Sequence, residues 1–177
     1  YVEVKNLQID ESDKGVNFIE TAVHYSNQGF KACIGIAISL ILFLSLVGMI
    51  NNLIGSFVDG VTLQSILAYI FAPFSFLMGV PKEEVMKVAE LLATRFVTNE
   101  VVAYGMPQFA MLSMKAKSMI TVALSGFTGI ASIAIMIGGY SAVAKNKIPT
   151  VASLGFKALI TSTVATMITG IMVGLFI

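Results

Sequence analysis

The sequence predicts an all-α membrane protein, built from transmembrane helices, a re-entrant helical hairpin and a broken helix. Three observations predict this fold class. First, 56% of the 177 residues are hydrophobic and only 12% are charged, whereas soluble domains carry about a quarter charged residues. Second, uncharged stretches of about 20 residues or more, the length of a membrane-spanning helix, recur along the chain. Third, Glu100 is the only acidic residue after Leu91, and it lies between apolar stretches.

The N-terminal third is expected to hold a polar segment, an interfacial helix and one long membrane span. Residues 1–31 begin polar and charged, and residues 16–30 then place apolar side chains at near-helical spacing among polar ones. Such a helix beside a membrane segment is expected to lie along the interface, with a solvated linker helix as the alternative. Residues 32–58 are uncharged, and a helix of about 40 Å exceeds the roughly 30 Å of hydrocarbon, so this span must tilt or project. Because the chain starts with Tyr rather than Met, it is expected to be part of a longer protein.

Residues 81–114 are expected to form the re-entrant hairpin. Residues 61–80 come before it as an interfacial or kinked helix, which Pro73 is expected to interrupt after Phe71. Each hairpin arm would have about 15 residues, or roughly 22 Å, which is too short to cross a membrane. The tip would be Thr98-Asn99-Glu100. Non-helical backbone at that depth is tolerated only where protein buries it or water reaches it.

Residues 115–144 are expected to form a transmembrane helix that glycine interrupts. Gly126 and Gly129 stand near its middle, beside Ser and Thr. Glycines at this spacing mark close helix packing in membranes, or an unwound stretch that offers backbone groups to a ligand. The spacing alone leaves both interpretations open. Residues 150–177 complete the predicted spans as a final transmembrane helix.

Glu100 is the candidate binding residue. An ionisable group at membrane depth is costly, so it faces a partner, a cavity or a ligand. A hairpin with an acidic tip, followed by a broken span, is typical of one half of a secondary transporter, whose interrupted helices build the substrate site. The carboxylate would accept hydrogen bonds from hydroxyl or amine groups, with Asn99 as donor and acceptor beside it. The alternative is a salt bridge from Glu100 to Arg95 or to a lysine at the end of a span.

Other chemistry is not indicated. With one His and one Cys, the chain has neither a soft-metal site nor an internal disulfide. It contains no glycine-rich phosphate loop and no plausible Ser–His–acid triad, so neither an enzyme nor a bound cofactor is expected. The formal net charge is +1, and no basic cluster indicates a nucleic-acid partner.

Three motifs resemble the C-terminal half of the concentrative nucleoside transporters. They are Phe71-Ala72-Pro73-Phe74-Ser75-Phe76-Leu77-Met78-Gly79-Val80-Pro81, then Thr98-Asn99-Glu100-Val101-Val102-Ala103-Tyr104, then Ser125-Gly126-Phe127 with Ser132-Ile133-Ala134-Ile135 and Gly138-Gly139. Their order and spacing match over nearly the whole chain. The Asn-Glu-x-Val-Ala-Tyr element is fairly specific, whereas glycine pairs and apolar runs alone would not be.

The resemblance implies an elevator-type importer, a multi-pass homotrimer of the cell membrane that carries nucleosides by symport with Na⁺ or H⁺. This chain would be its second inverted repeat, with residues 32–58 in the trimer scaffold and residues 81–177 in the moving transport domain. The implied substrate-binding residues lie in the hairpin tip and the broken span: Glu100, Asn99, Phe127, Gly129 and Ser132. The cation site and the nucleobase-binding hairpin are expected mainly in the N-terminal half of such a transporter.

Two positions depart from the family pattern. The family usually has Asn, a ribose contact, where this chain has Gly129, and it tends to have Ser where this chain has Ala131. Gly129→Asn is therefore expected to raise the affinity for ordinary ribonucleosides if the pocket keeps the family geometry. Two other functions stay open: the same architecture acting on a modified nucleoside or another polar solute, and a gating or signalling subunit that binds nucleosides without moving them.

Overall fold

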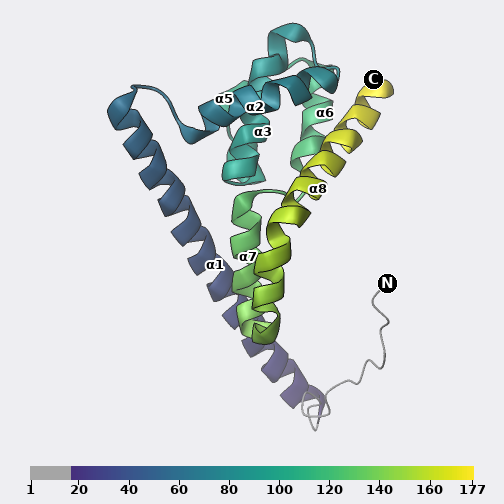
Figure 1. The fold of residues 1–177 in the computed structure, drawn as a ribbon. Helices are drawn as coiled ribbons and strands as arrows, with labels where there is room; N and C mark the ends of the chain where they lie inside the picture. Colours follow the sequence, from purple (N-terminus) through teal and green to yellow (C-terminus); the bar gives the residue numbers. More distant parts are fainter. Residues whose placement is uncertain (1–16) are drawn as a thin grey trace.

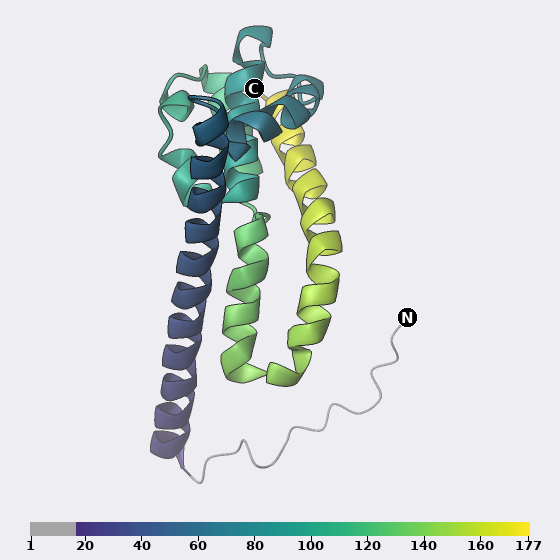
Figure 2. The same cartoon turned by 60° about the vertical axis from the view of Figure 1, so that its left-hand side comes forward.

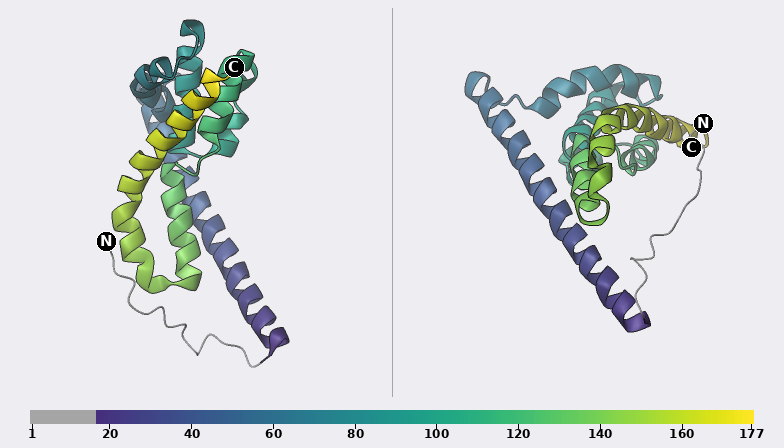
Figure 3. Two further views of the ribbon diagram at one scale, coloured as in Figure 1. Left: turned by 90° about the vertical axis from the view of Figure 1, so that its right-hand side faces the viewer. Right: turned by 60° about the horizontal axis from the view of Figure 1, so that its bottom comes forward.

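The described part of the chain, residues 17–177 of the computed structural model, is built from helices without strands (Figure 1). This confirms the prediction of an all-α protein. The longest helix lies along one side of the others (Figure 3). In chain order the elements are α1 (Phe18–Phe57), α2 (Leu63–Leu77), η2 (Lys82–Glu84), α3 (Val85–Val97), α4 (Glu100–Tyr104), α5 (Pro107–Ala110), α6 (Met114–Leu124), α7 (Ile130–Val143), η3 (Lys145–Lys147) and α8 (Ile148–Leu175).

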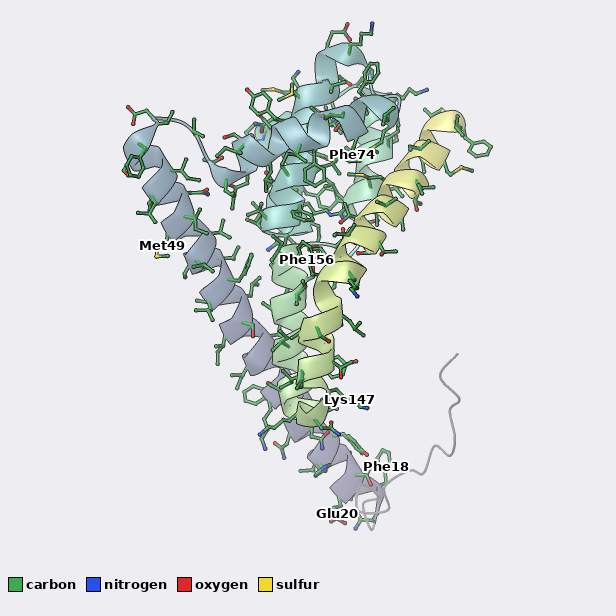
Figure 4. All side chains as sticks on the ribbon, viewed as in Figure 1. Phe18, Glu20, Met49, Phe74, Lys147 and Phe156 are labelled. Carbon is green, nitrogen blue, oxygen red and sulfur yellow. The ribbon has the colours of Figure 1, made fainter. Side chains whose placement is uncertain are left out.

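Helix α1 is one continuous helix of 40 residues, or about 60 Å. The expectation of a separate interfacial helix at residues 16–30 is wrong, because α1 runs through Lys31 and no proline breaks it. Asn17 stabilises its start, since the side chain accepts a hydrogen bond from the Glu20 N–H at 2.8 Å. Residues 1–16, with the start of the expected polar segment, lie outside the described residues. Most apolar side chains of α1 are exposed, and Met49 projects away from the other helices (Figure 4).

Asn51 holds the turn between α1 and α2. Its side chain donates a hydrogen bond to Gln64 Oε1 at 3.0 Å and accepts one from the Leu63 N–H at 2.8 Å. Thr62 begins α2 in a capping box with Ser65, in which each side chain bonds the other residue's backbone N–H. These hydrogen bonds position α2 across the end of α1.

Helix α2 passes through Pro73 and ends at Leu77, so the predicted turn after Phe71 is wrong. A proline inside a helix removes one hydrogen bond of the ladder. The buried side chains Phe71 and Ser75 lie one turn apart on the face of α2 that packs against α3. Tertiary packing of this kind overrides local helix propensity.

A hairpin follows, formed by α3 and the two short helices α4 and α5. The apolar face of α3 makes the core together with α6, through Val88, Ala89, Leu92, Ile120 and Ala123. The second arm is not one continuous helix. It is instead divided at Gly105, because Pro107 lacks the N–H that a continuing ladder needs and starts α5. At the base of the hairpin, the Glu84 carboxylate accepts hydrogen bonds from the Ser113 N–H at 2.7 Å and from Ser113 Oγ at 2.8 Å.

The stretch expected to form the broken span consists of α6 and α7, which residues 125–129 separate. The short turn η3, which includes the labelled Lys147 (Figure 4), reverses the chain. Helix α8 then runs back beside α7 and onward to α6 (Figure 2). The break therefore faces α3 on one side and α8 on the other, which places it next to the hairpin.

Helix α1 contacts the rest of the chain chiefly through α7, at a crossing made by two glycines. A Cβ atom at Gly35 would lie 2.7 Å from the Gly138 carbonyl oxygen, and a Cβ at Gly138 would lie 2.5 Å from the Gly35 carbonyl oxygen. Backbones approach this closely only where side chains are absent, as at small-residue helix contacts in membranes.

Gly138→Ala is therefore expected to force α1 and α7 apart. Overpacking of a tight contact costs about 1–3 kcal/mol, so the full-length protein in detergent should unfold at a lower temperature. Gly55→Ala is the matched control on α1, since a Cβ there meets nothing within 4 Å. Equal unfolding temperatures for the two variants would contradict the close crossing.

Candidate functional site

The hairpin tip is formed by Thr98 and Asn99, between the end of α3 and the start of α4. Asn99 has an extended backbone, and its Oδ1 accepts a hydrogen bond from the Val102 N–H at 2.9 Å. This N-cap starts α4 and makes Glu100 its first residue. The Asn99 side-chain oxygen Oδ1 is thus used to cap α4, while the Nδ2 donor of the same side chain remains for other contacts.

Glu100 is half-buried, and its carboxylate has neither a hydrogen bond nor an ion pair within residues 17–177. The alternative of a salt bridge to Arg95 or to a lysine is not found in this part of the chain. A carboxylate that is partly removed from solvent, without a partner, can accept hydrogen bonds from a ligand.

The Arg95 side chain lies inside the protein, where its charge and that of Glu100 attract each other through space without forming a salt bridge. It is almost completely buried, at 1% exposure. Its guanidinium donates hydrogen bonds to the carbonyl oxygen of Ala123 in the last turn of α6, to the carbonyl oxygen of Thr128 and to the hydroxyl of Thr166 on α8. Arg95 thereby joins the hairpin to the break between α6 and α7. The cost argument that singled out Glu100 applies equally to an arginine in an apolar stretch, and it could have marked Arg95 as well.

Gly129 lies where the break meets the hairpin. A Cβ atom there would be 2.7 Å from the Arg95 carbonyl oxygen and 3.3 Å from that of Thr98. Its N–H donates to Ser132 Oγ at 3.2 Å, which starts α7. The stretch is therefore unwound and Gly129 also allows close packing, whereas contact of its backbone groups with a ligand stays a prediction.

The expected site residues divide into two groups. Phe127, Gly129 and Ser132 line one cavity between α7 and α8, together with Leu159 and Ser162. Asn99 and Glu100 do not line it. The cavity has about 60 Å³, whereas small-molecule sites have about 300–1,000 Å³, so this cavity does not by itself enclose a ligand.

Other cavities of the described part are larger but almost wholly apolar. One of about 450 Å³ lies between α1 and α7, and one of about 170 Å³ lies between α2, α3 and α8. Within residues 17–177 no group of three or more His, Cys, Asp or Glu side chains could hold a metal ion. The polar groups able to orient a ligand are therefore those of the hairpin tip and the break.

Tyr104 also joins the hairpin to the broken helix. Its hydroxyl donates a hydrogen bond of 2.6 Å to the carbonyl oxygen of Thr121, in the last turn of α6. The same carbonyl oxygen accepts from the Ser125 N–H at 3.2 Å, so Tyr104 adds a second hydrogen bond at this helix end. Tyr104 and Arg95 thus cap the last turn of α6 from the hairpin. For Tyr104, the sequence alone contains no signal of this role.

Tyr104→Phe is expected to lower the unfolding free energy by about 0.5–1.5 kcal/mol, the usual net value of one hydrogen bond. The measurement is thermal unfolding of the full-length protein in detergent. Tyr69→Phe is the matched control, because Tyr69 lies exposed on α2. If Tyr104→Phe leaves the unfolding temperature at that of the control, the cap contributes no stability.

These features define a class of protein. Two helices, Phe18–Phe57 and Lys145–Leu175, are long and apolar enough to cross a membrane, judged by length and composition. A hairpin whose tip carries an unpaired carboxylate packs against a helix unwound at its middle, which is the arrangement found in one half of many secondary transporters. The class is that of helical membrane transporters.

The chain belongs to the family described as Na⁺ dependent nucleoside transporter C-terminus, whose model matches residues 2–174. It is 32% identical to the uncharacterized transporter YutK of Bacillus subtilis, covering 97% of this chain and 44% of that protein. It is also 32% identical to human solute carrier family 28 member 3, covering 98% of this chain and 28% of that protein. The chain therefore spans less than half the length of these relatives.

Solved structures of CNTnw have the same fold. A variant in an outward-facing state is 31% identical and matches with a TM-score of 0.83, over 98% of this chain and 45% of that one. CNTnw in an inward-facing substrate-bound state is 32% identical and matches with a TM-score of 0.70, over the same shares. The resemblance seen in the sequence motifs is thus confirmed at the level of the family and the fold.

Proposed function

We propose that this chain is the second half of a cation-coupled nucleoside importer and supplies the ribose-binding side of its substrate site. The observation that carries the proposal is the half-buried Glu100 carboxylate at the hairpin tip, which makes no hydrogen bond or ion pair within residues 17–177. A carboxylate accepts short, charge-assisted hydrogen bonds from hydroxyl groups. Adjacent ribose hydroxyls offer two such donors, and membership of the nucleoside transporter family supports a nucleoside as their source.

The neighbouring groups suit the same ligand. Asn99 keeps its Nδ2 donor for a sugar oxygen, because its Oδ1 caps α4. Phe127 is half exposed beside the break and can pack on an apolar face of the ligand. Ser132 Oγ already accepts from the Gly129 N–H, so its hydroxyl proton is available for a ligand oxygen. Gly129 contributes its close backbone contact and no side chain.

The transport step we propose is an elevator movement. Helix α1 would stay with the scaffold of a homotrimer, and residues 81–177 would move against it with the substrate. Two observations support this division: α1 contacts the other described elements chiefly through α7, and its outer face is apolar and exposed. The TM-scores to outward-facing and inward-facing CNTnw differ, 0.83 against 0.70, as expected if parts of the fold change their relative positions between states.

Uptake into liposomes tests the proposal. The full-length transporter is reconstituted, and accumulation of labelled uridine and adenosine is measured under an imposed Na⁺ gradient, an H⁺ gradient or neither. Accumulation that depends on one gradient is expected, and the family description favours Na⁺. Nucleoside binding in detergent without uptake under either gradient would instead support a non-transporting gating or signalling subunit. The protein is proposed to act as a multi-pass protein of the cell membrane.

A second candidate substrate is a modified nucleoside or another polar solute. Gly129 has no side chain, and Ala131 is apolar and completely buried. The start of α7 therefore offers a sugar fewer polar groups than the Asn and Ser of the family pattern would. Competition of unlabelled ribonucleosides, deoxyribonucleosides and modified nucleosides against a bound labelled nucleoside would separate the two. Stronger competition by a modified nucleoside than by uridine or adenosine favours the second candidate.

A further inference from the structure

The guanidinium of Arg95 occupies a cage of neutral oxygen atoms. Nη1 donates to the Ala123 carbonyl oxygen and to Thr166 Oγ1 at 3.2 Å, and Nη2 donates to Thr166 Oγ1 at 3.3 Å and to the Thr128 carbonyl oxygen at 3.4 Å. No carboxylate is paired with it in the described part of the chain. A full positive charge, 1% exposed, is therefore hydrogen-bonded to neutral oxygen atoms, and the Glu100 carboxylate attracts it only through space.

The cage suits a cation of any kind. The Ala123 carbonyl lies at the C-terminal end of α6, where the helix dipole places partial negative charge. The Thr128 carbonyl belongs to unwound backbone, and Thr128 Oγ1 is buried there without a hydrogen-bond partner in the described structure. In secondary transporters, carbonyls of half-helix C-termini and of unwound backbone coordinate the coupling ion. These are the same kinds of oxygen that hold Arg95.

Arg95 also contacts the break through its backbone, at Gly129. The Arg95 carbonyl oxygen lies against Gly129, at 2.7 Å from the position of a Cβ atom there. Its side chain bonds the residue before Gly129 and the end of α6. Any loss of the charge in the cage would thus loosen the contact between the hairpin and the unwound stretch.

We propose that Arg95 acts as a tethered cation. In this half of the transporter its guanidinium permanently occupies an oxygen cage of the kind that holds a coupling ion in other secondary transporters. This half then keeps its break closed against the hairpin without binding a dissolved cation. The coupling aspect rests on the proposed function, whereas the filling of the cage by Arg95 does not.

The first test compares Arg95→Lys with Arg95→Met in the full-length protein. The two side chains are nearly equal in length and differ in charge. Thermal unfolding is measured in detergent with N-methylglucamine chloride as the salt. Arg95→Lys is expected to unfold at least roughly 5 °C above Arg95→Met, because an uncharged side chain leaves buried carbonyl oxygens without donors. Equal unfolding temperatures would overturn the proposal.

The second test empties the cage with Arg95→Ala. Millimolar ethylguanidinium, added to the same buffer, is expected to raise the unfolding temperature of this variant more than that of the wild type. Lys87→Ala, on the same helix and partly buried, is the matched control and should respond as the wild type does. A response of Arg95→Ala that does not exceed the control would overturn the proposal.

If the Arg95 variants do not fold, Thr166→Val provides the test of the proposal. It removes the hydroxyl that accepts from both guanidinium nitrogens, whereas the exposed Thr169 bonds only Ala165 of its own helix. Thr166→Val is expected to unfold at a lower temperature than Thr169→Val, and equal temperatures would overturn the proposal. None of these measurements needs a nucleoside. Failure of wild-type uptake would therefore contradict the proposed function while leaving the tethered cation standing.

Discussion

Glu100→Gln in the full-length protein is expected to abolish nucleoside uptake or reduce it strongly. The change keeps the size of the side chain and removes its charge, so the ribose hydroxyls lose a charged acceptor. Hydrogen bonds to charged groups contribute about 1.5–3 kcal/mol, which corresponds to a loss of roughly 10- to 100-fold in affinity for one bond. Uptake of labelled nucleoside into liposomes under the productive cation gradient measures the effect.

Thermal stability separates this role from a structural one. Because the Glu100 carboxylate makes no hydrogen bond or salt bridge within the described residues and acts on Arg95 only through space, Glu100→Gln is expected to unfold close to the wild-type temperature. A salt bridge to Arg95 would instead make the variant less stable. Glu83→Gln is the matched control, since Glu83 is exposed in η2, away from the hairpin tip, and should transport normally. Uptake by Glu100→Gln close to that of Glu83→Gln would show that Glu100 does not bind the substrate.

Gly129→Ala is expected to disrupt the contact between the hairpin and the break. The added Cβ would lie 2.7 Å from the Arg95 carbonyl oxygen, and this backbone atom cannot move aside as a flexible side chain could. Overpacking costs typically about 1–3 kcal/mol, and a displaced break would also separate Phe127 and Ser132 from the hairpin tip. Both the unfolding temperature and the uptake of nucleoside are expected to fall.

The same geometry argues against the gain of affinity expected from the family pattern for Gly129→Asn. Asparagine carries the same Cβ and a longer side chain, so the close backbone contact must open before its amide can meet a sugar. Gly105→Ala is the matched control in the hairpin, since its Cβ would make only ordinary contacts, the nearest at 3.5 Å. Wild-type stability in Gly129→Asn together with tighter ribonucleoside binding would show that the backbones separate freely.

The main features of the candidate site could be predicted from local sequence. A single carboxylate between apolar stretches marked the hairpin tip, and Asn99 before it is a good N-cap, so α4 starts where the polar residues end. Gly126 and Gly129 marked the break, because glycine is a poor helix former without a side chain to pack. These signals lie within a few residues of the feature that they predict.

Features that depend on distant contacts could not be predicted in this way. Pro73 was expected to end its helix, yet the face of α2 that packs on α3 keeps the helix continuous. Arg95 lies 28 residues from Ala123 and 71 residues from Thr166, and no local pattern brings these groups together. Their meeting results from the packing of α3, α6 and α8.

The sequence by itself determined an all-helical membrane protein of the nucleoside transporter family, with an acidic hairpin tip and a glycine break. These properties follow from hydropathy, charge and backbone preference, which act over short stretches of chain. Only the tertiary structure decided that Glu100 stays unpaired while Arg95 turns inward to a cage of carbonyl and hydroxyl oxygens. The physical reason is that a buried charge is stabilised by whichever dipoles surround it, and folding places those dipoles.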